Sequence, residues 1–346
     1  MKKAFILFLI LMLSGCGKST EEKVIDSIDQ ANTLLTTKKC DEAITVLEGI
    51  GRQTSNPRYI VSLASAYACK AGYSSVTFFS QDLGRITQDD STFGGLAAMS
   101  TSDDAVTPDF YTDTKVTSLL KAINVLLYAG GGIASNEEPT YSKRLEIYGN
   151  ESGDVNSYAV YLLLAYLGKF YHYFGDASVD TSSSTNNAVK AGGSLPGTCM
   201  TSYTNAEDII SAGSDVDTYL SNSNTGSCDS VSGSTIRSEL NAGAANRRAL
   251  LCQAIVGFNN LLELIPLVIA DATETDLSNI SDISNSISAA KTQLTNLFNA
   301  GAGASDQAAL AATIISQNQT LCESSTTINI KSLEAYFLLL VESTFK

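Results

Sequence analysis

The sequence has no tryptophan, a single histidine and few positive charges, and the last two shortages each exclude a class of function. With His172 as the only imidazole, a metal centre built from several histidines is excluded, and any Ser-His-Asp triad depends on this one residue. The 22 Lys and Arg residues stand against 36 Asp and Glu, which gives a net charge of −14. An acidic chain repels phosphate backbones, so we expect no nucleic-acid partner.

Proline is also scarce, and no segment shows the alternation of apolar and polar residues that predicts a half-buried strand. Apolar residues instead recur at steps of three and four, which places them on one face of a helix. The N-terminal stripes are Val24, Ile28, Ala31 and Leu35; Ala43, Leu47 and Ile50; Ile60, Ala64, Tyr67 and Ala71; and Val76, Phe79, Leu83 and Ile86. We predict an all-α protein of antiparallel helical hairpins, because the connections between these segments are short.

Helical periodicity continues through the rest of the chain. Residues 113–129 predict a helix that ends at Gly130-Gly131-Gly132, and 155–174 are apolar nearly all round, which is typical of a central helix. The C-terminal stripes predict helices through Leu251 to Ile265, bent or stopped near Pro266, and then over 280–297, 308–317 and 328–345. Outside the N-terminal signal we expect no membrane-spanning helix, because each apolar run is too short or is interrupted.

The first 16 residues combine Lys2 and Lys3, a ten-residue apolar core and a cysteine. This core has about half the length of a spanning helix and is typical of an export signal. The sequence LSGC at 13–16 resembles the lipobox of bacterial lipoproteins. That resemblance implies cleavage before Cys16 and a membrane anchor of acyl chains on Cys16. Gly17 then favours the outer membrane of a Gram-negative bacterium; the alternative is a plain signal peptide with a chance cysteine.

Two N-terminal segments align at an offset of 33 residues, namely 31–50 and 64–83. They resemble the tetratricopeptide repeat, a helix-turn-helix unit, through Leu63-Ala64, Tyr67 and Tyr73. Val76 and Ser80 depart from the pattern, and a generic helical hairpin is the alternative. Stacked repeats imply a concave surface that binds peptides or proteins. Tyr59 and Tyr73 are our candidates for that surface, because tyrosine offers apolar contact and a hydroxyl; Tyr67 is expected to pack in the core.

Six cysteines remain after Cys16, and an even number in an exported chain favours disulfides over free buried thiols. The stacked-repeat geometry predicts a Cys40–Cys69 bridge. Cys199 and Cys228 flank an expected short helix at 205–220 and are natural partners, which leaves Cys252 with Cys322. No pair has the spacing of a zinc site, so we predict no metal. The sequence also has no P-loop and no GxGxxG between a strand and a helix, and we predict no cofactor.

The expected organisation follows from these patterns. The ranges are 1–15 signal peptide, 16–23 lipidated tether, 24–87 repeat-like helices, 88–112 loop, 113–175 helical hairpin region, 176–235 Ser-, Thr- and Gly-rich loops with one short helix, and 236–346 C-terminal helices.

Signals for catalysis are weak. Glu151-Ser152-Gly153 is similar to the acid motif of lytic transglycosylases, but the Met-Gln segment that should follow is absent. His172 precedes Asp176 by four residues and reads as a core side chain. We therefore expect no catalytic residue and predict a lipid-anchored, helical-repeat scaffold or adaptor with an envelope protein partner, similar in kind to the lipoprotein component of TRAP transporters. The alternative is a cell-wall-acting enzyme or a small-molecule carrier associated with a transporter; the oligomeric state stays open.

Overall fold

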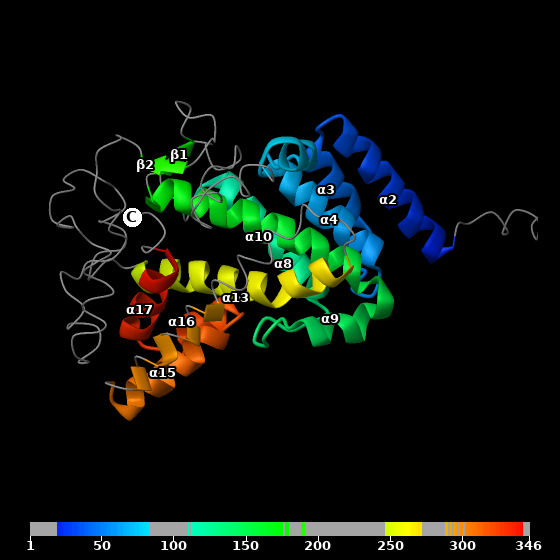
Figure 1. Ribbon diagram of the computed structural model, residues 1–346. Helices are drawn as coiled ribbons and strands as arrows, with labels where there is room; N and C mark the ends of the chain where they lie inside the picture. Colours follow the sequence, from blue (N-terminus) through cyan, green and yellow to red (C-terminus); the bar gives the residue numbers. More distant parts are fainter. Residues whose placement is uncertain are drawn as a thin grey trace, which may run out of the picture.

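The computed structural model describes residues 19–82, 110, 112–175, 177–179, 188–190, 246–271 and most of 288–341, and these residues form an all-α fold as predicted (Figure 1). No strand was expected, but β1 (Ala177–Val179) forms a short antiparallel pair with β2 (Ala188–Lys190). Strands of three residues are too short for alternation to be recognised in the sequence. The predicted signal peptide, Cys16, the helix expected at 205–220 and most of the loop expected at 88–112 lie outside the described residues.

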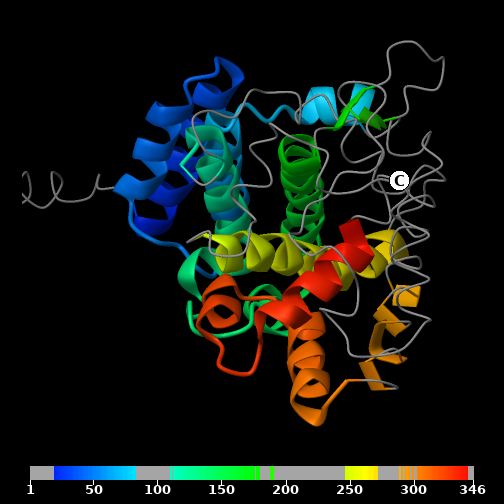
Figure 2. The same ribbon diagram turned by 90° about the vertical axis from the view of Figure 1, so that its left-hand side faces the viewer.

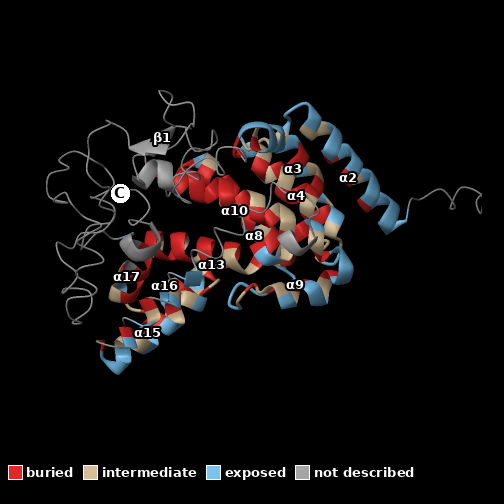
Figure 3. Ribbon diagram, in the orientation of Figure 1, coloured by how far each residue is buried: buried red, intermediate tan, exposed pale blue. Residues whose placement is uncertain are grey.

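Three N-terminal helices, α2 (Thr20–Thr36), α3 (Cys40–Gly49) and α4 (Pro57–Lys70), pack against one another. α2 begins with a capping box between Ser19 and Glu22, and α4 begins with an Asn56 cap followed by proline at the first helical position. The predicted stripes face the shared core: Ala31, Ala43, Leu47, Ile60 and Ala64 are all fully buried. Figure 3 shows buried residues gathered where these helices meet.

The prediction that Val76 and Phe79 lie on the buried face of a fourth helix was wrong. The chain forms a single turn, α5 (Ser75–Thr77), and then a π-helical turn, η1 (Phe78–Asp82), which shifts the buried face. Val76 is 75% and Phe79 51% exposed, whereas Phe78 is buried with its ring centroid 5.2 Å from that of Tyr161. Leu83 and Ile86 lie outside the described residues. The second hairpin is therefore incomplete in the described part of the chain, and the repeat resemblance stays a prediction.

α4 instead packs most extensively against α8 (Thr114–Leu127), whose predicted stripe is buried. α8 ends in the turn η3 (Ala129–Gly131), where Gly130 and Gly131 have positive φ, as the glycine run predicted. The centre of the molecule is α10 (Ser152–Gly175), which packs against both α8 and α13 (Arg247–Asp271) (Figure 2). Its apolar residues are buried on most sides, as expected for a central helix.

Pro266 does not end its helix, because α13 continues to Asp271. Pro266 is exposed, so the lost backbone hydrogen bond faces water rather than the core. Among the described helices, only α13 is long and apolar enough to cross a membrane, over Arg248–Leu267. The sequence analysis did not predict this segment as a candidate span. Two-thirds of this segment is buried inside the protein, as in the core helix of a globular domain.

The C-terminal helices pack against α13 and are α15 (Ala304–Ile315), α16 (Gln319–Ser324) and α17 (Ile330–Val341). The sequence predicted α15 and α17 but not the short α16, nor α9 (Tyr141–Tyr148) and the turn η4 (Gly149–Glu151). Buried polar side chains join these helices. Lys291 Nζ donates to Asn259 Oδ1 at 2.8 Å and lies 5.5 Å from the Tyr336 ring centroid. Burial lowers the pKa of Lys291 to about 8.

Two of the three expected cysteine pairs are at disulfide distance. The Cα atoms of Cys40 and Cys69 are 5.6 Å apart, which joins the start of α3 to the end of α4. Those of Cys252 and Cys322 are 5.8 Å apart and join α13 to α16. Cys199 and Cys228 lie outside the described residues, so their pairing stays a prediction.

Candidate functional site

A pocket of about 410 Å³ lies between α3, α4 and α8, within the usual range of small-molecule sites. Its lining comes from three helices and two turns: Glu48, Gly51, Arg52, Tyr59, Leu63, Tyr67, Lys121, Asn124, Val125, Gly130 and Gly131. We refer to it as the α3–α4–α8 pocket.

Helical spacing explains why these side chains share one pocket. Tyr59, Leu63 and Tyr67 are four residues apart and lie along one face of α4. Lys121 and Val125 have the same spacing on α8, which packs against that face. The glycines after α8 complete the wall by close approach: a Cβ at Gly131 would lie 2.4 Å from Arg52 Nη1. Only glycine fits there, because φ is also +101°.

The wall of the pocket carries two tyrosines whose hydroxyl protons are donated within the protein. Tyr59 is 2% exposed, and its hydroxyl donates to the Leu47 carbonyl at 3.2 Å. The Tyr67 hydroxyl donates to Glu48 Oε1 at 2.5 Å. Burial, and then the Glu48 carboxylate, raise the pKa of Tyr67 to about 12, and burial raises that of Tyr59. Both phenols therefore stay protonated at neutral pH.

Two cations stand at the rim of the pocket, and both are exposed to solvent. Lys121 Nζ lies 5.6 Å from the centroid of the Tyr67 ring, in cation–π contact. Arg52 lies against Gly131 and, among the described residues, has neither a hydrogen bond nor an ion pair. With Glu48 as the single carboxylate of the lining, the pocket has a net charge of +1 in an acidic protein.

The structure separates the two tyrosines proposed for a binding surface. Tyr59 lines the pocket, but as a buried wall rather than an exposed side chain. Tyr73 lies elsewhere, in an aromatic cluster with its ring centroid 6.1 Å from Phe78 and 6.3 Å from Tyr158. Burial raises the pKa of Tyr73, and its hydroxyl has no hydrogen-bond partner among the described residues. Tyr67, for which core packing was the favoured role, contributes to the pocket.

Sequence reasoning missed the charged part of the pocket, Glu48, Arg52 and Lys121. The only signal for it is the two-residue Gly51-Arg52 exit from α3, which by itself indicates nothing about a site. Glu151 is exposed in the η4 turn and is not part of the pocket lining. His172 belongs to α10, and its side chain lies outside the described residues.

Within the described residues, no group of three or more His, Cys, Asp or Glu side chains is arranged to hold a metal ion. The groups that the pocket offers are two cations, phenol oxygens that can accept a hydrogen bond, and apolar walls. Comparison with known proteins gave no match, whether to family models, to curated proteins or to solved structures.

Proposed function

We propose that this protein is an exported, lipid-anchored binding protein of the cell envelope that holds its ligand or partner in the α3–α4–α8 pocket. The observation that carries the proposal is the pocket itself: three packed helices line an open pocket of about 410 Å³, with two tyrosine side chains on its wall and cations at the rim. The LSGC sequence at 13–16 supports a lipid anchor, and such an anchor would hold this pocket at a membrane surface.

Two modes of binding fit the pocket. As an adaptor, the protein would receive the end of a partner chain, since the exposed Arg52, Lys121 and Asn124 leave the rim accessible. As a carrier, it would receive a free small molecule, and the volume of the pocket favours this second candidate. Both modes place the ligand against the same residues, so one probe in the pocket reports on both.

The test is photo-crosslinking in living cells from a pocket position. We would replace Asn124 with the photoreactive amino acid p-benzoylphenylalanine and, as a matched control, Gln30, which is exposed on α2 outside the pocket lining. We expect ultraviolet-dependent adducts from position 124 and none from position 30. An adduct of protein size identifies an adaptor, and one of small mass a carrier. Equal adducts from both positions, or none from position 124, would contradict the proposal.

A further inference from the structure

The charge and lining of the pocket indicate the chemistry of its occupant. We propose that the α3–α4–α8 pocket binds a monocarboxylate with an apolar body, supplied either as a free acid or as the C-terminal residue of a peptide. This inference rests on the proposed function of the same pocket as a binding site.

The first argument is the geometry of the rim cations. Arg52 follows the end of α3 and lies against Gly131, and Lys121 stands on α8; both side chains belong to the pocket lining. The guanidinium of Arg52 is not engaged by a carboxylate within the described residues, so its paired N–H donors remain available. A planar fork of this kind matches a carboxylate with two parallel hydrogen bonds.

The second argument is the charge of the lining. Arg52 and Lys121 exceed Glu48 by one positive charge, which a single carboxylate neutralises. A phosphate monoester carries about −1.5 to −2 at neutral pH. It would leave the pocket negative and place its charge near Glu48, which already accepts a hydrogen bond from Tyr67. The lining therefore favours a monoanion over a phosphate.

The third argument is the apolar surface below the rim. Leu63 and Val125 face the pocket from α4 and α8, and the rings of Tyr59 and Tyr67 add two aromatic walls. Burial of an apolar group against these side chains supplies affinity that is independent of charge. A ligand that places its carboxylate at the rim and an aliphatic or aromatic group on these walls satisfies both parts of the site.

The experiment is calorimetric titration of the full mature protein in detergent with four probes. N-acetyl-phenylalanine presents the carboxylate and an apolar ring, and its primary amide removes only the charge. N-acetyl-glycyl-glycyl-phenylalanine presents the same group at the end of a peptide, and phenyl phosphate replaces the carboxylate by phosphate. We expect both acids to bind at least about tenfold more tightly than the amide and than the phosphate. Tighter binding of the tripeptide than of the free acid identifies a chain terminus as the source.

Variants locate the binding in the pocket. Arg52→Gln and, separately, Lys121→Gln should each weaken acid binding by about tenfold, whereas Arg58→Gln, an exposed arginine of α4 outside the lining, should leave it unchanged. Glu48→Gln should tighten acid binding, because it removes the only negative charge of the lining while an amide oxygen still accepts from Tyr67. Unchanged thermal unfolding of each variant confirms that it is folded.

Three results would overturn the inference. The first is that the amide binds as tightly as the acids, and the second is that phenyl phosphate binds more tightly than either acid. The third is that neither Arg52→Gln nor Lys121→Gln weakens acid binding. Adducts from position 124 together with no binding of any acid would overturn only the ligand class and leave the proposed function standing. If position 124 gives no adducts and no acid binds, both the proposed function and the ligand class are overturned.

Discussion

Replacing Arg144 with methionine is expected to lower the free energy of unfolding by about 3–5 kcal/mol, because it breaks a buried ionic network. Arg144 is fully buried, yet its guanidinium connects four parts of the chain. Nε donates to Asn156 Oδ1 at 2.7 Å, and Nη2 lies 3.4 Å from Glu263 Oε2. Nη1 donates to the carbonyls of Leu127 and Pro139.

Methionine fills much of the same volume but donates no hydrogen bond, so buried acceptors on α8, α10 and the 139 loop lose their partner. Burial lowers the pKa of Arg144, and the Glu263 carboxylate opposes this shift. Leu127 is the last residue of α8 and lies three residues before Gly130 of the pocket lining, so the same change should also loosen the pocket wall.

Urea unfolding followed by circular dichroism measures the effect. The neighbouring Lys143→Met variant is the matched control, because Lys143 pairs with Glu137 at the surface, with side chains 36% and 51% exposed. An exposed pair of this kind contributes about 0–1 kcal/mol. Equal losses for the two variants would show that the Arg144 network is not what joins α9 to the core.

Removing the Cys252–Cys322 bridge should lower the free energy of unfolding by about 4 kcal/mol in the chain-entropy model. The two cysteines are fully buried and 70 residues apart in sequence, so the bridge closes a long loop. We expect this loss for the double variant Cys252→Ala/Cys322→Ala. The Cys40–Cys69 bridge closes only 29 residues, and its removal should cost less, about 3.5 kcal/mol.

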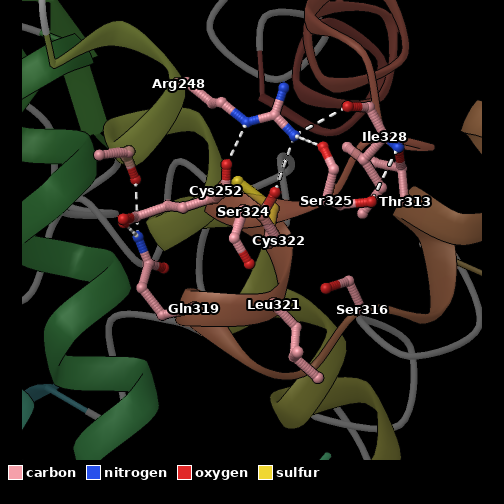
Figure 4. The surroundings of a disulfide bond; sticks show 12 residues. Arg248, Cys252, Thr313, Ser316, Gln319, Leu321, Cys322, Ser324, Ser325 and Ile328 are labelled. Atoms are coloured by element: carbon pink, nitrogen blue, oxygen red, sulfur yellow. Dashed lines mark hydrogen bonds between the residues drawn. A yellow bond between two sulfur atoms is a disulfide. The ribbon is translucent and has the colours of Figure 1, made fainter. Parts of the chain in front are cut away.

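The fold around the bridge is expected to persist without it. Arg248 donates to the carbonyls of Cys322, Ser325 and Ile328 at 2.8–2.9 Å, which holds the end of α16 against α13 (Figure 4). Thermal unfolding with and without reductant separates the two contributions. Added reductant should destabilise the wild type more than the double variant, because the double variant has one disulfide fewer to lose. A double variant as stable as the wild type would contradict a role of this disulfide in stability.

The sequence predicted most helices because their apolar stripes are long and regular. Ala31, Ile60 and Leu119 each lie at the expected buried position of a helix with several matching neighbours. Short elements escaped prediction: α9, α16 and the β1–β2 pair offer too few periods to be read. At Val76 and Phe79 the pattern was misleading, because a π-helical turn buries Phe78 instead.

The pocket was much harder to predict than the helices. Glu48 on α3 and Lys121 on α8 are more than 70 residues apart, and the packing of both helices against α4 brings them to one site. The periodicity of each helix places Glu48 and Lys121 off the apolar stripe, and therefore on the helix surface. Most charged residues of a helix lie there, so this position does not mark a binding site. Tyr59 was selected for its side-chain chemistry, and its buried position follows from α3 packing that no local pattern encodes.

Export is the claim on which the anchor, the disulfides and the site of action all depend. The most direct test is the intact mass of the protein extracted from washed membranes, measured with and without reductant. The account predicts a chain that begins at Cys16, carries acyl groups there and gains the mass of hydrogens on reduction of its disulfides. The Cys16→Ser variant should leave the membrane fraction. A chain that still begins at Met1, has free thiols and is recovered in the soluble fraction would contradict the account.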